Sequence, residues 1–324
     1  MAVIGLDLGG TKLAGGLFDE SGELLDRKIA PLSNRKGPDV GILIAGLLRE
    51  LLNESSARKH RISGVGVSVP GIAHTDTGRV WAPNIQGWGD YPLREELTRS
   101  LASAECRVVV DSDRACSILG EHWKGAARGC SNAIFLAVGT GIGAGILADG
   151  RVIRGAQDIA GATGWMSLRQ PFREEYVQCG CFEYHASGEG IATVARELLT
   201  QRSTYRGILS GRDPDAITAH DVFAAFDAND TIAREAIDGA IQSWGSAAAN
   251  FVSLFNPERI IFGGGIFGPA VRFLEDIRRE AAKWAQPISM RTVQFLASEL
   301  GSDAALYGAA ALVQGDTRVA SGNK

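Results

Sequence analysis

The chain has 324 residues with 33 basic and 37 acidic side chains, and its net charge of −4 argues against nucleic acid or an anionic membrane as a partner. Its 41 glycines are a larger share of the chain than the average of about 7%. They do not recur at every third position, which excludes a collagen helix, so they indicate turns or close backbone approaches. Five cysteines, an odd number, indicate reduced thiols and a cytoplasmic protein. Neither a signal peptide nor a membrane span is expected.

The first half of the chain predicts an α/β domain. Apolar runs separated by turns predict a meander of three strands over Val3–Leu8, Leu13–Phe18 and Glu23–Ile29. Further along, helices are expected at Val40–Leu52, Arg94–Leu101 and about Arg114–Trp123, and strands at Ile62–Val69 and Arg107–Val110. Strands followed by helices in this order are typical of an α/β domain.

The strand pattern then restarts. When the chain is shifted by 130 residues, seven of the seventeen positions from Val3 to Asp19 are identical, among them Gly9 with Gly139. This agreement predicts a duplicated strand–turn–strand unit. A second α/β domain is expected after it, with helices at Gly190–Leu199, Asp230–Phe255, Ala270–Trp284 and Ser302–Val313 and strands at Arg259–Phe262 and Thr292–Leu296.

Three glycine clusters each follow an apolar strand: Asp7-Leu8-Gly9-Gly10-Thr11-Lys12, Gly139-Thr140-Gly141 and Gly263-Gly264-Gly265. Turns without Cβ atoms let backbone N–H groups converge on an anion, so the clusters indicate a nucleotide-phosphate site, although tight hairpins alone also need glycine. A P-loop does not fit, because Thr11 and Lys12 stand in reversed order. Gly263, Gly265 and Gly268 match the dinucleotide pattern, but its ribose-binding acid would fall within or just after a helix.

These residues carry a resemblance to a family. The segment Asp7–Lys12 resembles the first phosphate motif of the ROK family of sugar kinases, within the actin-like ATPase superfamily, and Gly139–Gly141 resembles the second. Asn256-Pro257 with Gly263–Gly265 is similar to the adenosine-side segment, and Gly301–Ala310 to the closing helix. The resemblance covers nearly the whole chain. It implies two actin-like (ribonuclease H-like) α/β domains with an interdomain cleft, ATP and Mg²⁺ as cofactors, and a homodimer.

The expected domains are residues 1–116 with the C-terminal helix 303–324, and residues 117–302. The resemblance assigns phosphate binding to the turn residues Gly9, Gly10, Thr11, Lys12, Gly139, Thr140, Gly141, Gly263, Gly264 and Gly265. Asp7 ends a strand beside the first turn, which suits either an acid that orients hydrated Mg²⁺ or a structural cap of the turn.

The candidate for a general base is Asp113, in Val108-Val109-Val110-Asp111-Ser112-Asp113. Its place between a strand and a helix is equally that of an N-cap, and the residues alone favour the cap. The resemblance places Asp113 on the catalytic aspartate, which accepts the proton of the sugar hydroxyl during phosphoryl transfer. Ser112 then replaces the family's usual sugar-binding Asn.

The resemblance assigns sugar contacts to Gly71, Asn84, Ser112, Asp113, Trp165 and Glu183. The family pattern Glu-x-Gly-His falls on Ala162–Trp165, so Ala162 replaces an acid that contacts sugar and Trp165 replaces a zinc-binding His. The first two zinc cysteines fall on Glu174 and Tyr176, which leaves Cys181. Tetrahedral zinc needs four ligands, and Cys179, Cys181 and His185 do not have a usual zinc spacing, so no structural zinc is expected. Trp165 is expected to fill the vacated site or to stack on a sugar ring.

The sequence therefore predicts an ATP-dependent kinase for a hexose or hexose derivative. The substrate need not be glucose, because the lost carboxylate and imidazole would discriminate sugars by hydrogen bonding. The first alternative is a catalytically reduced sugar-binding sensor or scaffold. The second, which fewer sequence features favour, is an NAD-dependent oxidoreductase. Repressors of the family carry a winged helix before the sugar domain. No DNA reader is expected here, because the phosphate motif begins at Asp7.

Overall fold

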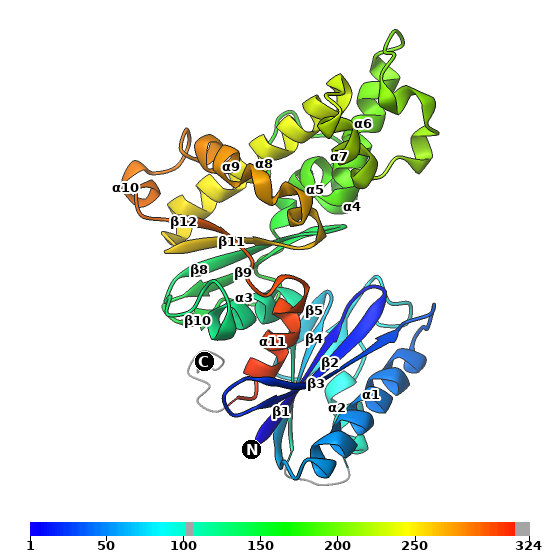
Figure 1. The fold of residues 1–324 in the computed structure, drawn as a ribbon, viewed down its shortest axis with the longest axis vertical. Helices are drawn as coiled ribbons and strands as arrows, with labels where there is room; N and C mark the ends of the chain where they lie inside the picture. The colour runs from blue at the N-terminus through cyan, green and yellow to red at the C-terminus, as the bar shows by residue number, and fades with distance from the viewer. Residues whose placement is uncertain (102–105, 315–324) are drawn as a thin grey trace. The chain divides into compact units, whose positions relative to one another are not determined.

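In the computed structural model, the described residues, 1–101 and 106–314, form two compact units (Figure 1). The first unit contains residues 1–131, 145–161 and the segment from Ser298 onward, and the second contains 132–144 and 162–297. The boundaries differ from the expected ones because helix α3 (Asp113–Lys124) packs against α11 (Ala304–Ala311) and so belongs wholly to the first unit. Residues 315–324 of the expected C-terminal helix lie outside the described residues.

The sheet of the first unit has the strand order β3-β2-β1-β4-β7. The predicted meander is confirmed, since β1 is antiparallel to β2 and β2 to β3, while β4 pairs parallel with both β1 and β7. The parallel register aligns Asp7 with Ser68 and Ser68 with Asp111, so these three side chains mark the carboxyl ends of adjacent strands. The strands are β1 (Ala2–Leu8), β2 (Lys12–Asp19), β3 (Leu24–Pro31), β4 (Ile62–Val69) and β7 (Arg107–Ser112).

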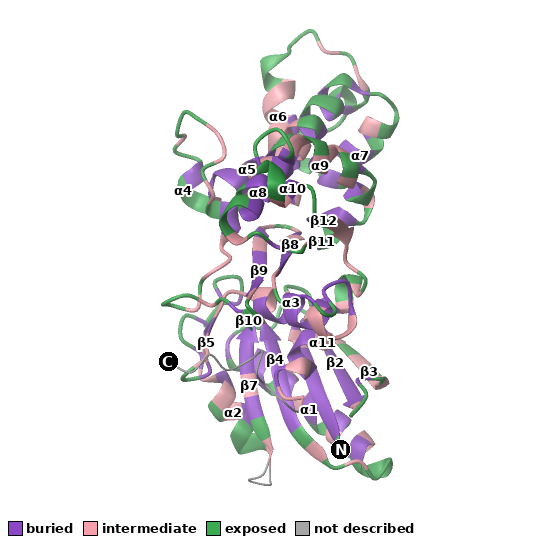
Figure 2. Ribbon diagram, turned by 90° about the vertical axis from the view of Figure 1, so that its left-hand side faces the viewer, coloured by how far each residue is buried: buried purple, intermediate pink, exposed green. Residues whose placement is uncertain are grey.

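Both faces of this sheet are buried along β1, β2 and β4, whereas the edge strand β3 is partly exposed. Alternate residues of β1 point to opposite faces, so Ile4 and Leu6 join the core under α1 (Pro38–Ala57), whereas Val3 joins a second cluster with Leu306 of α11. The purple strands in Figure 2 show this two-sided burial. Burial on both faces explains why β1 reads as a continuous apolar run rather than an alternating one. Beside the main sheet lie α2 (Leu93–Ser100) and the hairpin β5 (Ile72–His74) and β6 (Arg79–Trp81).

Glycines inside regular elements let α11 approach its neighbours closely. A Cβ on Gly66 of β4 would lie 1.7 Å from the carbonyl oxygen of Ala309, and one on Gly120 of α3 would lie 2.0 Å from that of Ala304. A Cβ on Gly308 would lie 1.7 Å from the carbonyl oxygen of Cys116. Part of the glycine surplus therefore serves helix packing rather than turns.

We expect Gly308→Ala to destabilise the protein by about 3 kcal/mol, because the new methyl group meets backbone that cannot move aside cheaply. Gly46→Ala is the matched control: Gly46 lies inside α1 with nothing within 4 Å of its Cβ position, and alanine there should stabilise the helix by about 1 kcal/mol. Urea unfolding of both variants measures the two effects. Equal stabilities would contradict the close packing of α3 on α11.

The second sheet has the order β10-β9-β8-β11-β12, and the unit boundary falls within β9. The expected repeat is present, because a glycine turn joins β8 to β9 as another joins β1 to β2. The strands are β8 (Ala133–Val138), β9 (Ile142–Ala148), β10 (Arg151–Val152), β11 (Arg259–Gly263) and β12 (Gln294–Ala297).

Helices of the second unit gather around α8 (Thr231–Phe255), whose buried residues occur along nearly its whole length. Asp230 caps this helix by accepting hydrogen bonds from the backbone N–H groups of Ile232 and Ala233. The other helices are α4 (Tyr176–Cys179), α5 (Cys181–Ala186), α6 (Gly188–Gln201), α7 (Ala219–Asp227), α9 (Leu274–Ala281) and α10 (Pro287–Met290).

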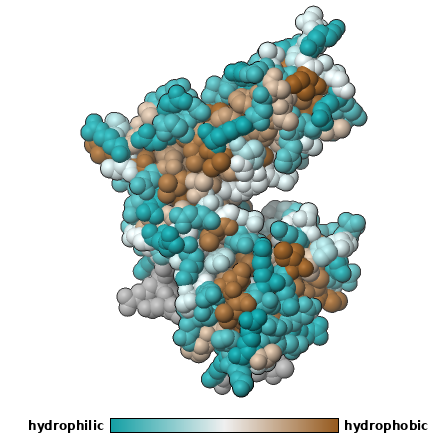
Figure 3. Space-filling view, in the orientation of Figure 1, coloured by the Kyte–Doolittle hydropathy of each residue, from teal (hydrophilic) through white to brown (hydrophobic). Residues whose placement is uncertain are grey.

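Most of the long predicted elements are confirmed, and so are short ones such as α2 and β12, but several other short elements were missed. The hairpin β5–β6 and helices α4, α5 and α7 were not predicted, and the expected helix 270–284 is a 3₁₀ turn followed by the shorter α9. Figure 3 shows hydrophobic residues scattered among hydrophilic ones on the surface of each unit. Within the described residues, no helix is both long and apolar enough to cross a bilayer.

Candidate functional site

The carboxyl ends of β1, β4 and β7 bring two acids of the first unit together. Asp7 accepts a hydrogen bond from the Ser68 hydroxyl at 2.7 Å, and burial raises the pKa of Asp7 to about 6. The Ser68 hydrogen bond opposes that rise in pKa, and the negative charge of Asp113 adds to it. Asp113 is therefore close enough to Asp7 for the two charges to interact.

Asp113 is not the cap of its helix. Ser112 is the N-cap of α3, with its Oγ accepting from the N–H of Ala115 at 3.3 Å, while an Asp113 carboxylate oxygen accepts from the N–H of Arg114 at 2.8 Å. Burial raises the pKa of Asp113, and the charge of Arg114 works against that rise. A raised pKa moves a carboxylate toward the range that suits a general base.

A buried ion pair lies directly before this acid. Asp111, whose side chain is 3% exposed, accepts from Arg154 Nε at 2.9 Å and from Arg154 Nη2 at 2.6 Å. The second Asp111 oxygen accepts from the N–H of Ser112 at 2.8 Å. The pair thus ties the end of β7, and with it the start of α3, to the segment after β10. Burial raises the pKa of Asp111, and Arg154 opposes the rise.

The first predicted phosphate turn, Gly9–Lys12, joins β1 to β2. It is closed by a hydrogen bond from the Gly9 N–H to the Lys12 carbonyl at 2.9 Å. Gly10, Thr11 and Lys12 are exposed, and a Cβ on Gly10 would have no heavy atom within 4 Å. The turn therefore presents its hydroxyl, ammonium and backbone groups outward beside Asp7.

Two further predicted sugar-contact residues of the first unit lie on loops, Gly71 after β4 and Asn84 after β6. Gly71 has a φ of 87°, and a Cβ there would lie 2.2 Å from the Trp81 carbonyl oxygen, so the position requires glycine. The Gly71 carbonyl accepts a hydrogen bond from Arg114 Nη2 at 3.1 Å. Asn84 is exposed. Trp88, four residues further along the chain, is a core residue, 1% exposed.

A cavity of about 580 Å³ in the second unit brings two of the predicted clusters together. Its wall contains Gly139 and Thr140 from the turn between β8 and β9, together with Gly265 from the turn after β11. Arg196 donates to the Ile217 carbonyl at 2.9 Å and to Glu189 at 2.8 Å, which fixes another part of the wall. The remaining lining residues are Gly188, Asp215, Thr218, Ala219, His220, Phe223, Ile266 and Pro269.

The third cluster makes a tight turn into a 3₁₀ helix, Gly265–Phe267. Gly264 has a φ of 86°, and a Cβ there would lie 2.4 Å from the Val138 carbonyl oxygen. A Cβ on Gly263 would lie 2.4 Å from the Phe135 ring. Gly263 and Gly264 thus let β11 and its turn pack closely on β8, whereas Gly265 is open and lines the cavity.

Glu183, a predicted sugar ligand on α5, contacts the second predicted phosphate turn. Its Oε2 accepts a hydrogen bond from the N–H of Ile142 at 2.6 Å. Burial raises the pKa of Glu183, and this hydrogen bond opposes the rise. The carboxylate also lies 2.7 Å from the Cβ position of Gly141 and 2.9 Å from that of Gly164.

Trp165 does not fill the vacated zinc position, and that expectation is wrong. The tryptophan side chain is 59% exposed at the end of a 3₁₀ turn, Thr163–Trp165. Tyr176 is buried, and its hydroxyl lies 2.8 Å from His185 Nε2. Tyr176 was missed because the resemblance marked it only as a lost cysteine.

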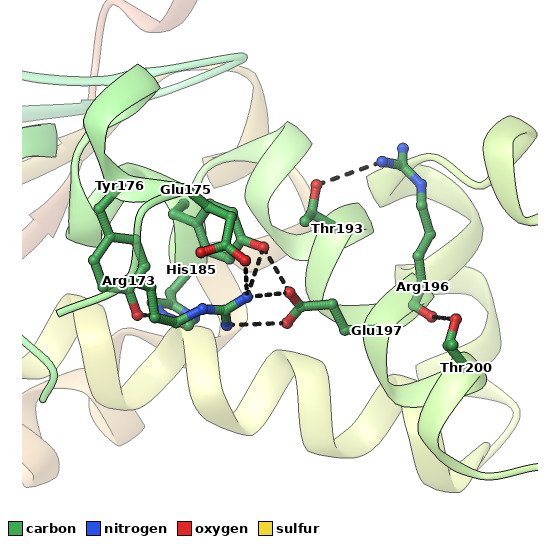
Figure 4. A network of polar contacts seen from close by, with 9 residues as sticks. Arg173, Glu175, Tyr176, His185, Thr193, Arg196, Glu197 and Thr200 are labelled. Atoms are coloured by element: carbon green, nitrogen blue, oxygen red, sulfur yellow. Dashed lines mark hydrogen bonds and ion pairs between the residues drawn. The ribbon is translucent and has the colours of Figure 1, made fainter. Parts of the chain in front are cut away.

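A polar network extends from this pair (Figure 4). Arg173 lies between Glu175 and Glu197, at 3.1 and 2.6 Å, and the hydroxyl of Tyr184 donates to Glu197 at 2.6 Å. Burial lowers the pKa of His185 to about 4, so its imidazole is neutral at neutral pH. The segment before α5 is thus held by side-chain hydrogen bonds and ion pairs. Among the described residues, no three His, Cys, Asp or Glu side chains are grouped to hold a metal ion, and none of the five cysteines, all of which lie within those residues, forms a disulfide.

Several residues of these arrangements were not predicted from the sequence. Ser68 and Asp111 are polar residues near the ends of apolar strands, a signal that could have found both. Arg154, Arg114 and the wall residues around Phe223 carry no such signal, because only the fold brings them near the predicted turns.

Comparisons with known proteins agree with the sequence resemblance. The model of the ROK family matches residues 3–316. The glucokinase of Halalkalibacterium halodurans is 32% identical over 99% of this chain and 98% of its own length. The ROK hexokinase structure from Thermus thermophilus is 29% identical with a TM-score of 0.77, over 97% of this chain and 98% of that one.

A further solved structure has ligands. It is a ROK family glucokinase from Streptomyces griseus in complex with glucose and AMPPNP, 25% identical with a TM-score of 0.74, over 98% of this chain and 100% of that one. The expected fold class, α/β with two actin-like domains, is confirmed by these structural likenesses. A family match over nearly the whole chain makes this protein a member of the ROK family.

Proposed function

We propose that this protein is an ATP-dependent sugar kinase, which transfers the γ-phosphoryl group to a hydroxyl of a hexose or hexose derivative. One observation carries the proposal: residues 125 positions apart, Thr140 and Gly265, line one cavity with glycine turns on its wall. Backbone N–H groups in such turns suit phosphate oxygens. The relatives named glucokinase and hexokinase support the same reaction class, and the AMPPNP in one of them supports ATP as the donor.

The first unit supplies the groups for the transfer. The hydroxyl oxygen of the sugar attacks the γ-phosphorus, the bond to the β,γ-bridging oxygen breaks and ADP leaves. Asp113 accepts the hydroxyl proton as general base, for which its raised pKa is suited. Thr11 and Lys12 are exposed at the first turn and can donate to phosphate oxygens. In the second unit, Gly139–Gly141 and Gly263–Gly265 are assigned to the nucleotide.

Asp7 fits a ligand of Mg²⁺, directly or through water. Burial raises the pKa of the Asp7 carboxyl group to about 6, and the negative charge of Asp113 adds to the rise. A divalent cation beside Asp7 would therefore compensate a poorly solvated negative charge. When bound, Mg²⁺ would neutralise charge on the phosphates. Ser68 fixes the Asp7 carboxylate through its 2.7 Å hydrogen bond.

Gly71, Asn84, Ser112, Trp165 and Glu183 are proposed to contact the sugar, alongside the base Asp113. The exposure of Trp165 supports stacking on a sugar ring, because an aromatic face open to solvent is available to an apolar sugar face. Ala162 offers no carboxylate, so the proposed substrate class remains broader than glucose. The homodimer implied by the resemblance also belongs to this proposal.

The test is a panel of hexoses, N-acetylated hexosamines and hexose glycosides, each offered with Mg·ATP in a coupled assay of ADP release. We expect phosphorylation of at least one sugar, verified by mass spectrometry of the product. ADP release without sugar is the background control. If no sugar is phosphorylated while sugars still bind in calorimetry, the kinase proposal fails and a sugar-binding sensor is supported instead.

A further inference from the structure

The turn that carries Gly139–Gly141 is held from outside by the segment from α5 to α6. Within the turn, the Gly139 N–H donates to the Gly141 carbonyl at 2.9 Å. From outside, Gly188 at the start of α6 donates to the Gly139 carbonyl at 2.8 Å. At the other end, Ile142 donates its N–H to Glu183 Oε2 at 2.6 Å. The segment from α5 to α6 thus binds the turn at both ends.

The bond at the Ile142 end is the only one of the three that uses a side chain. A short hydrogen bond between a backbone N–H and an ionised carboxylate is stronger than one between neutral groups. Glu183 lies on α5, inside the packed part of the unit and beside buried Phe182 and His185, so its backbone is fixed independently of the turn. Its carboxylate can therefore hold the turn in place.

The small residues around Glu183 fit this role. The nearest heavy atoms to a Cβ on Gly141 all belong to the Glu183 carboxyl group, with Oε2 at 2.7 Å. Gly141 has no φ in the left-handed region, so backbone conformation does not require glycine there. A Cβ on Gly164 would also lie 2.9 Å from Oε2. Glycine at both positions makes room for this carboxylate.

We infer that Glu183 is a positioning residue for nucleotide binding, which fixes the Gly139–Ile142 turn through its Oε2. This rests on the proposed function and adds to the proposed sugar contact of Glu183, which the other carboxylate oxygen would have to make. Loss of the carboxylate frees the Ile142 end of the turn, so nucleotide must order the turn when it binds. Nucleotide affinity then falls even when no sugar is present.

The experiment compares Glu183→Ala, Glu183→Gln and the exposed control Glu174→Gln by calorimetric titration of the full chain with Mg·AMPPNP, without sugar. We expect about tenfold weaker binding for Glu183→Ala, as for the loss of one charge-assisted hydrogen bond. Glu183→Gln keeps an oxygen acceptor and should recover most of the affinity, and Glu174→Gln should bind like the wild type. In kinetics, the KM for ATP should rise without an equal loss of kcat.

A double-variant cycle tests the contact itself. Gly141→Ala should weaken nucleotide binding in the wild-type background, because its methyl group displaces the carboxylate, and should cost little more in the Glu183→Ala background. Equal losses in both backgrounds would overturn the inference, as would unchanged nucleotide affinity in Glu183→Ala with only sugar affinity reduced. Should Glu183→Ala fail to fold, Glu183→Ser, whose short side chain also removes the carboxyl group from beside Gly141, replaces it in the cycle. A wild type that binds no Mg·AMPPNP would instead refute the proposed function.

Discussion

Asp113→Asn should reduce sugar phosphorylation by about a thousandfold while leaving nucleotide affinity nearly unchanged. The amide has the shape of the carboxyl group and can still accept the hydrogen bond from the Arg114 N–H, so the start of α3 is kept. It cannot accept the hydroxyl proton at neutral pH. Single-turnover phosphorylation measures the first effect, and titration with Mg·AMPPNP measures the second.

The control for this substitution is Asp39→Asn. Asp39 also lies in the first turn of a helix of the first unit, but it is exposed and belongs to α1. This variant loses the same charge and should keep its turnover. Turnover in Asp113→Asn comparable to that of the control would remove Asp113 from the proposed mechanism.

Arg154→Met should destabilise the protein by about 3 kcal/mol, because it leaves the buried Asp111 carboxylate without its cation. Burial raises the pKa of Asp111 in the folded wild type, and the charge of Arg154 opposes that rise. In the variant this opposition is lost, so the pKa of Asp111 in the folded state rises further. A group with a raised folded pKa favours folding when protonated, so the deficit should be small near about pH 5 and larger near about pH 8. Urea unfolding at the two pH values measures it.

The matched variant is Asp111→Asn combined with Arg154→Met. Asparagine keeps an acceptor for the Ser112 N–H but carries no charge, so the double variant should regain most of the lost stability at the higher pH. A double variant as unstable as Arg154→Met would show that packing of the Arg154 side chain, rather than its charge, stabilises the end of β7.

Long periodic segments made much of the fold predictable. The continuous apolar run of β1 identifies a strand buried on both faces, and the helical spacing of apolar residues in α1 identifies a helix buried on one face. Asp7 and Asp113 could be singled out because each ends or follows a strand. Their closeness across the sheet depends on β4 lying between β1 and β7, an order the sequence does not state.

Contacts between distant segments were beyond prediction. Nothing around Glu183 indicates that its carboxylate reaches the backbone of Ile142, and nothing around Trp165 indicates that the tryptophan stays exposed. Gly66 and Gly308 read as ordinary glycines in a strand and a helix, and only the packing of α11 explains them. In each case the decisive neighbour is far away in sequence.

The packing of α11 on α3, β1 and β4 has a consequence for the synthesis of the chain. Helix α3, which begins with Asp113, packs on α11, and α11 is synthesised after α3 and after residues 162–297. Strands β1 and β4 also contact α11 and therefore lack this contact until α11 has emerged. Residues 162–297 emerge earlier and can fold as they appear, whereas the N-terminal sheet stays uncovered on one face until Ala304–Ala311 arrives. A ribosome stalled before this helix would therefore hold an unfinished first unit, with its proposed base not yet fixed in place.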